Sequence, residues 1–95
     1  RVIARKTLKD FWEKHAGSEQ VLKAWFHEAK ATRWKSFTDI KSRYRSADVL
    51  PGNRVVFIQG TTYRLIVHLH YHAGIVFIRF IGTHADYDRI DATTL

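Results

Sequence analysis

Cysteine is absent from this chain of 95 residues. Its absence excludes disulfides, thiol catalysis and thiolate zinc sites, and it suits a reducing cytoplasm, which we take as the expected location. Long apolar runs are absent as well. None approaches the roughly 20 residues that cross a bilayer, so we expect no membrane partner. A chain of this length predicts a single domain over residues 1–95 with a modest core.

Acidic residues are few compared with basic ones. Sixteen Lys and Arg stand against nine Asp and Glu, which gives a net charge of +7 and a pI near 10.1. This balance indicates an acidic partner such as nucleic acid, a membrane surface or an acidic protein. A basic surface that serves solubility alone would show the same balance, so charge by itself does not decide the function.

The first half of the chain has helical periodicity. Val2-Ile3 reads as a short strand, and a helix is expected over Thr7–His15 with Thr7 as its cap. Ser18 is expected to cap a second helix whose apolar face runs from Val21 to Ala29. The two helices should form a hairpin that packs on one face of a sheet.

The middle of the chain, residues 32–52, is basic and aromatic with weak periodicity. A short helix is expected to begin at Ser36 or Thr38, and Pro51-Gly52-Asn53 predicts a turn.

The second half changes to a period of two. Strands are expected over Arg54–Gln59, Thr62–His72 and Gly74–Ile81, joined by turns at Gly60-Thr61 and Ala73-Gly74. The three strands should form an antiparallel meander. The predicted class is therefore α+β, with the short N-terminal strand and the helical hairpin packed on one face of a small antiparallel sheet.

The middle strand of the meander separates into two faces. The apolar face is expected to contact the core and comprises Tyr63, Leu65, Val67, Leu69 and Tyr71. The opposite face is polar and basic and comprises Arg64, Ile66, His68, His70 and His72. With helices on one side of the sheet, this second face should be open to a ligand or partner.

The segment Ile81–Asp88 is the richest in chemistry. A strand ends there in a glycine turn that presents His84, Asp86, Tyr87 and Asp88 together. Histidine titrates near neutral pH and suits proton transfer, so the turn indicates acid–base chemistry on a polyanion. The alternative is a turn histidine held by Asp86, with Tyr87 as a packing residue.

The alternating histidines His68, His70 and His72 allow three interpretations. Two of them could bind zinc, with His84 as a further ligand, but neither the second nor the third strand contains an acid to complete such a site. A half-exposed polar face and an RNA-facing role are the other two.

Each expected strand of the meander also carries one arginine: Arg54, Arg64 and Arg79. The guanidinium group binds phosphate through paired hydrogen bonds. By strict alternation, Arg79 and His84 share a face only if a bulge or turn intervenes. The alternative is that these are ordinary strand-edge arginines.

The chain resembles HigB-type toxins, a branch of the RelE superfamily of bacterial type II toxin–antitoxin systems. The similarity is carried by Arg1–Lys6, Leu8–Trp12, Tyr44–Ser46, Asn53–Phe57, Tyr63–Leu65 and Ile78–Asp88. One departure is Ile58, because family members often carry an asparagine after the phenylalanine of this strand.

The resemblance implies a RelE-like compact fold and an mRNA-cleaving enzyme. His84 sits where these RNases keep a catalytic His or Arg, Tyr87 sits near their catalytic aromatic residue, and Arg64 matches a phosphate-binding arginine. Arg54 is a weaker match to a first-strand Lys or Arg. The wider set expected to contact RNA comprises Arg54, Arg79, Lys41, Arg43, Arg45 and His70, and the basic loop Arg33-Trp34-Lys35 would suit that contact.

The hypothesis is therefore a metal-independent endoribonuclease toxin that uses the RNA 2′-hydroxyl as nucleophile, acts on the ribosome and inhibits translation. No cofactor or metal is expected. The expected partners are mRNA, the ribosome and a HigA-like antitoxin with a helix-turn-helix domain, through which DNA would be bound indirectly. The alternative is a non-catalytic module of the same fold that binds RNA or the antitoxin. A metal-dependent nuclease would lose its activity in EDTA.

Overall fold

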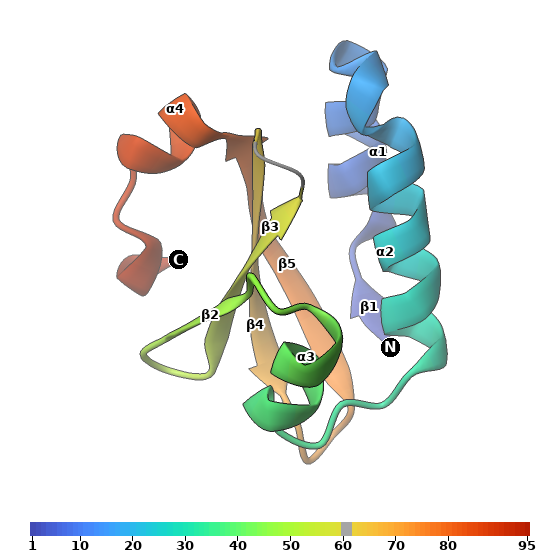
Figure 1. The fold of residues 1–95 in the computed structure, drawn as a ribbon, viewed down its shortest axis with the longest axis vertical. Coiled ribbons are helices and arrows are strands. Elements are labelled where there is room, and N and C mark those ends of the chain that lie inside the picture. The colour runs from blue at the N-terminus through green and yellow to red at the C-terminus, as the bar shows by residue number, and fades with distance from the viewer. Residues whose placement is uncertain (60–61) are drawn as a thin grey trace.

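The computed structural model describes residues 1–59 and 62–95, and within them a five-stranded sheet lies between two layers of helix (Figure 1). The strands are β1 (Val2–Ile3), β2 (Asp48–Leu50), β3 (Arg54–Gln59), β4 (Tyr63–His70) and β5 (Ile75–Thr83). The α-helices are α1 (Arg5–Lys14), α2 (Glu19–Ala31), α3 (Phe37–Arg43) and α4 (His84–Asp88), and two short 3₁₀ helices are η1 (Ala16–Ser18) and η2 (Ala92–Thr94). The expected α+β class is confirmed, and the turn predicted at Gly60-Thr61 lies outside the described residues.

The strand order is β1-β5-β4-β3-β2, and β3, β4 and β5 form the expected antiparallel meander. The sheet as a whole is mixed, because β1 pairs in parallel with β5, with Val2 opposite Val76. Two apolar residues contain no signal for strand direction, so the sequence could not show this. The three-residue strand β2, which pairs antiparallel with β3, was not predicted either.

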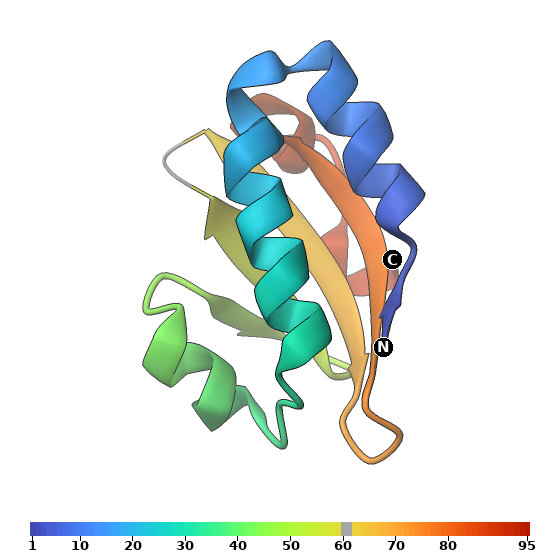
Figure 2. The same cartoon turned by 90° about the vertical axis from the view of Figure 1, so that its right-hand side faces the viewer.

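The helices α1 and α2 cover one face of the sheet (Figure 2). Leu8 and Trp12 of α1 lie one helical turn apart and are buried, as are Leu22, Trp25 and Ala29 of α2. This burial confirms the amphipathic hairpin expected from the sequence.

The predicted helix starts were less accurate. The first helix begins at Arg5, so Thr7 lies inside it and does not cap it. Ser18 precedes α2 but caps nothing, because its hydroxyl donates a hydrogen bond back to the His15 carbonyl at 2.7 Å. A serine before an apolar run is thus used here to close the η1 turn.

Aromatic rings fill the main core around Phe57 of β3. Its ring centroid lies 5.3 Å from that of Trp25, 5.7 Å from that of Trp34 and 5.1 Å from that of Tyr44. Trp34 is 5% exposed, so its expected role as an RNA contact was wrong. The loop that contains Trp34 is basic, but this ring is part of the core.

The two faces of β4 follow the predicted alternation only in part. Leu65, Val67 and Leu69 are buried in the main core, as expected. The opposite face was expected to be open, yet Ile66 is buried there in a second apolar cluster with Val56 and Ala92. The partly buried side chains of that cluster are Leu50, Phe80, Tyr87, Ile90 and Leu95. Figure 1 shows α4 and the segment after it lying against this face, so the chain's own C-terminal part covers its centre.

A β-bulge interrupts the pairing of β4 with β5. Ile66 pairs with Phe80 while Val67 pairs with Ile78, which leaves Arg79 as the extra residue. Strict alternation would keep Arg79 and His84 on different faces unless a bulge intervened, and that bulge is present. The Arg79 guanidinium lies over the Phe77 ring, 5.3 Å from its centroid.

Gly82 sits at the end of β5, where side chains leave little space. A β-carbon at this position would lie 2.5 Å from the tip of the Phe80 ring and 3.0 Å from the β-carbon of Asp86. Because Phe80 belongs to the second apolar cluster and Asp86 to α4, both the ring and the helix rest directly over this glycine.

We expect Gly82→Ala to lower the free energy of unfolding by about 1–3 kcal/mol, because the added methyl group must displace Phe80 or α4. Gly17→Ala is the matched control. A β-carbon there would lie 3.7 Å from the Tyr63 hydroxyl, an ordinary contact, so its effect should stay within about 0.5 kcal/mol. Urea denaturation measures both values, and equal effects would contradict the close packing over Gly82.

Candidate active site

A capping box fixes the junction between β5 and α4. The Thr83 hydroxyl accepts a hydrogen bond from the Asp86 backbone N–H at 3.2 Å, and the Asp86 carboxylate accepts one from the Thr83 N–H at 3.1 Å. These bonds hold the pKa of Asp86 below its usual value, and the nearby Arg89 and His15 lower it further. Asp86 is thus an ionised structural group that sets the direction of α4.

His84 is the first residue of α4 and lies at the surface. Its backbone N–H donates to the Thr62 carbonyl at 2.8 Å, while its side chain is 59% exposed. The acidic neighbour of the imidazole is Asp88, whose Oδ2 lies 3.7 Å from Nε2. This distance allows ionic attraction but is too long for a hydrogen bond. The alternative in which Asp86 holds the histidine is therefore wrong.

Tyr87 lies three residues after His84, so both side chains occupy neighbouring positions on the short helix. Its ring is half-buried and packs against the second apolar cluster. This packing fixes Tyr87 on α4, three residues from His84.

Arg64 reaches the same end of the sheet from β4. It pairs with Gly82, two residues before His84, and is half-buried with one guanidinium nitrogen 3.2 Å from the Tyr63 carbonyl. The helix α4 contacts β4 as well as β5. The structure therefore brings His84, Tyr87 and Arg64, named here the α4 site, to one end of the second sheet face.

His15 lies near this end too, although nothing in the sequence indicated it. It follows α1, its ring stacks on Phe11 with centroids 4.2 Å apart, and it meets the Tyr63 ring edge-on at 6.3 Å. Tyr63 pairs with Thr83, the residue that precedes α4, so His15 lies near the start of that helix. Local sequence patterns could not have placed His15 near a helix so distant in the chain.

Further along β4, the second face carries a different group of side chains. His68 pairs with Arg54 on one side and with Phe77 on the other. The rings of His68 and His70 are 4.9 Å apart, and His70 meets Phe77 edge-on at 5.1 Å. The name His–Arg cluster is used below for His68, His70, Phe77 and Arg79. The sequence marked His70 and Arg79 but not the ring of Phe77 between them.

Arg54 is already engaged in this structure. Its Nε donates to the Leu95 carbonyl and its Nη1 donates to the Pro51 carbonyl at 3.0 Å. It is thus a fixed positive charge beside the His–Arg cluster that holds the C-terminal segment against β3, with few donors left for RNA.

The basic residues of α3 lie away from the α4 site, on a helix that Ile40 anchors in the main core. Lys41 donates to the Ala47 carbonyl at 2.8 Å, and Arg43 pairs with Glu28 at 3.0 Å. Burial and the Glu28 carboxylate raise the pKa of the adjacent Tyr44 hydroxyl. Lys41, Arg43 and the exposed Arg45 are therefore not part of the α4 site.

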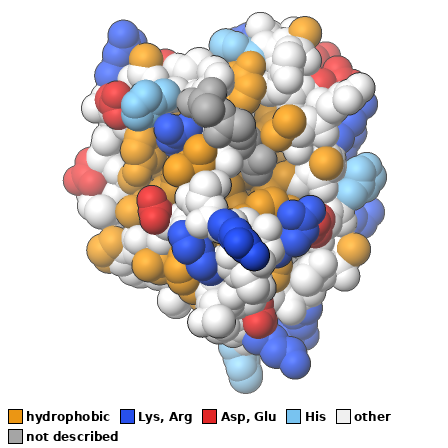
Figure 3. Space-filling model, viewed as in Figure 1, with side chains coloured by type: hydrophobic (Ala, Val, Ile, Leu, Met, Phe, Trp, Pro, Cys, Tyr) orange, Lys and Arg blue, Asp and Glu red, His pale blue; other side chains and the backbone are white. Residues whose placement is uncertain are grey.

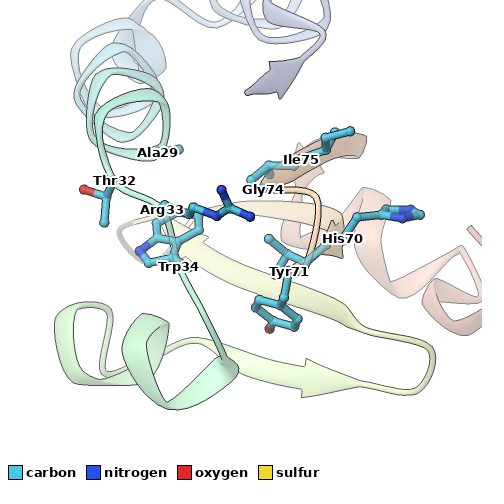
Figure 4. Close-up of a pocket in the computed structure, with 10 residues that line it drawn as sticks. Ala29, Thr32, Arg33, Trp34, His70, Tyr71, Gly74 and Ile75 are labelled. Atoms are coloured by element: carbon cyan, nitrogen blue, oxygen red, sulfur yellow. The ribbon is translucent and has the colours of Figure 1, made fainter.

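A hollow of about 230 Å³ opens beside the β4–β5 turn (Figure 4). Arg33 extends across it towards Gly74, and its guanidinium donates to the His72 carbonyl. Gly74 has a φ of 70°, and a β-carbon there would lie 3.1 Å from the Arg33 Nε. The bond from Arg33 supports the β4–β5 turn. Figure 4 shows the His70 side chain pointing away from this hollow, so the hollow is separate from the side chains of the α4 site and of the His–Arg cluster.

No group of three or more His, Cys, Asp and Glu side chains among the described residues is placed to hold a metal ion, so the alternative zinc set of strand histidines with His84 is not assembled. No helix among them is long and apolar enough to cross a membrane.

The surroundings of His68 predict how the stability of the fold depends on pH. Burial lowers its pKa, and so do the neighbouring charges of His70, Arg54 and Arg79, against an opposing hydrogen bond with the Gly52 backbone. As the pH falls, His68 is therefore protonated in the unfolded chain before it is protonated in the folded protein. The contribution of neutral His68 to the free energy of unfolding is present above about pH 6.5 and is lost below it.

We expect His68→Gln to reduce the loss of stability between about pH 7 and about pH 5. Thermal unfolding across that range measures the effect, with His27→Gln, an exposed histidine of α2, as the control that keeps the wild-type profile. A His68→Gln profile parallel to that of the wild type would contradict the predicted environment.

A model of a known protein family matches residues 18–90, a range that contains α2, α3, β2 to β5 and the α4 site. The family is described as HigB_toxin, the RelE-like toxic component of a toxin-antitoxin system. A search of curated proteins finds no match. Because the family match covers well over half of the chain, this protein belongs to the HigB family of RelE-like toxins.

Proposed function

We propose that this toxin is a metal-independent endoribonuclease that cleaves mRNA on the ribosome and so inhibits translation. The observation that carries the proposal is the α4 site. The exposed imidazole of His84 and the phenol of Tyr87 lie three residues apart on α4, and Arg64 lies on the neighbouring strand opposite Gly82, all at one end of the sheet. The family supports a ribonuclease-type toxin, and these three side chains supply the groups that such a reaction requires.

The reaction proposed is attack of the RNA 2′-hydroxyl on the adjacent phosphorus. A 2′-oxygen–phosphorus bond forms, the bond to the 5′-oxygen breaks, and negative charge builds on the phosphate oxygens. His84 exchanges a proton with the attacking or the leaving oxygen, and Tyr87 assists it. Arg64 stabilises the charge on phosphorus, because its guanidinium group remains protonated and offers several donors.

The surface charge supports a substrate rich in phosphate. Figure 3 shows Lys and Arg side chains across the lower half of one face of the molecule. With a net charge of +7, the protein is attracted to dense phosphate such as that of the ribosome, and salt weakens this attraction. Lys41, Arg43 and Arg45 would contribute to that wider contact, away from the α4 site.

As a toxin of a toxin–antitoxin system, the protein has an antitoxin as partner. We propose an antitoxin of the HigA type, whose helix-turn-helix domain would link the complex to DNA. The toxin itself would then contact DNA only through that partner.

We expect His84→Ala to reduce mRNA cleavage by about 10²–10⁴-fold, the usual contribution of a group that transfers protons. Arg64→Ala should reduce it strongly as well, because the charge on phosphorus loses its donor. Induced expression would be followed by growth and by mapping of mRNA 5′ ends. The wild type should arrest growth and produce new ends within translated frames.

The control is His27→Ala, which removes an exposed histidine of α2 on the opposite side of the sheet and should retain full arrest. Folding of each variant is checked by its thermal unfolding. Full arrest by folded His84→Ala and Arg64→Ala proteins would contradict the enzyme and favour a toxin that acts by binding alone.

A further inference from the structure

The His–Arg cluster lies on two strands, β4 and β5, on the part of the second face that the C-terminal segment does not bury, and Arg54 of β3 lies beside it. His68 is half-buried between Arg54 and Phe77, whereas His70 and Arg79 are exposed. Three rings are in contact, His68 with His70 at a centroid separation of 4.9 Å and a tilt of 45°, and His70 edge-on to Phe77 at 5.1 Å, and the Arg79 guanidinium lies 5.3 Å from the Phe77 centroid. Flat rings beside a guanidinium group form the type of surface on which nucleobases stack.

The cluster carries the positive charge of Arg79, with that of Arg54 beside it, and no described residue supplies an anionic partner. Among the described residues, no carboxylate forms an ion pair with His68, His70, Arg54 or Arg79. The guanidinium of Arg54 is held by carbonyl groups, whereas that of Arg79 makes no hydrogen bond within the described part of the chain. Concentrated positive charge without a protein partner favours an anion from outside, and Arg79 is free to bind it.

The cluster is also separate from the α4 site. Arg64 and His68 are four residues apart on β4, which corresponds to about 13 Å along an extended strand. Both lie on the same face, with the second apolar cluster between them around Ile66. An RNA strand that passes over the C-terminal segment could therefore contact both groups at once, with its phosphates a few nucleotides apart.

We infer that the His–Arg cluster is a second RNA subsite, in which Arg79 and the two imidazoles hold one phosphate while a base stacks on the rings. The RNA is the same single strand that the α4 site cleaves, so this inference rests on the proposed function for the identity of its ligand. Such a subsite would fix the position of the strand and would make no contact with the reacting phosphate.

The charges around His68 imply that binding there is coupled to a proton. The groups that face its imidazole are His70 on β4, Arg54 on β3, Arg79 on β5 and the Gly52 backbone in the preceding turn, while the C-terminal segment contributes the Leu95 carbonyl that Arg54 holds. In the free protein, burial and these positive charges lower the pKa of His68. A bound phosphate reverses the local charge and favours the protonated imidazole. RNA binding should therefore take up a proton and strengthen as the pH falls.

The test is the fluorescence anisotropy of a labelled 2′-O-methyl RNA oligonucleotide, which cannot be cleaved because it lacks the attacking hydroxyl. The wild type should bind at least about threefold more tightly at about pH 6 than at about pH 8, because the bound phosphate raises the pKa of His68. The variant His68→Gln/His70→Gln should lose that difference and bind more weakly at the lower pH. Arg79→Gln should weaken binding at both values and reduce the salt dependence by about one ion.

Two controls identify the source of the pH effect. His27→Gln on α2 should behave as the wild type, and His84→Gln should retain the difference between the two pH values. If His84→Gln abolishes the difference and the His68/His70 variant keeps it, the subsite is wrong. Equal affinity of Arg79→Gln and the wild type would overturn it as well.

Cleavage of unmodified mRNA is scored separately, so that the two proposals can fail independently. If the wild type cleaves mRNA and the His68/His70 variant binds RNA as the wild type does, only the proposed subsite is contradicted. If the wild type does not cleave mRNA but its RNA binding depends on pH and on His68 and His70, the proposed enzyme is contradicted and the cluster remains a binding site for single-stranded RNA.

Discussion

The contact between Gly82, the Phe80 ring and α4 is the constraint on which the α4 site depends. With no side chain at Gly82, the ring can lie across the strand and the helix can begin immediately afterwards. The capping box between Thr83 and Asp86 then sets the direction of α4. As a result His84 is exposed, Tyr87 packs against the second apolar cluster, and Arg64 lies opposite Gly82 on the neighbouring strand.

The same packing divides the second sheet face into three parts. The C-terminal segment buries Ile66 and Val56 in the centre, and Arg54 holds that segment through the Leu95 carbonyl. Polar residues of β4 and β5 lie at the two ends of this face, with the α4 site at one end and the His–Arg cluster at the other. Burial of the apolar centre between them stabilises the fold.

Much of this arrangement was predictable from the sequence. The period of two identified the meander and placed Leu65, Val67 and Leu69 in the core. The predicted glycine turn before His84 was wrong, because Gly82 is a paired residue of β5 and α4 begins directly after that strand. The failures share a physical cause, which is dependence on contacts distant in the chain. Arg54 meets a carbonyl 41 residues away, and Trp34 is drawn into the core by Trp25 and Phe57. Local patterns contain no information on such contacts or on the direction of a two-residue strand.

The chemistry of the RNA ends tests the central claim most directly. The purified toxin would be added to ribosomes translating a defined mRNA, and the termini at each cut would be analysed. Attack by the 2′-hydroxyl leaves a 2′,3′-cyclic phosphate on one fragment and a 5′-hydroxyl on the other, and the account predicts these ends. A 3′-hydroxyl paired with a 5′-phosphate would show that water attacked instead, and it would contradict the roles assigned to His84, Tyr87 and Arg64.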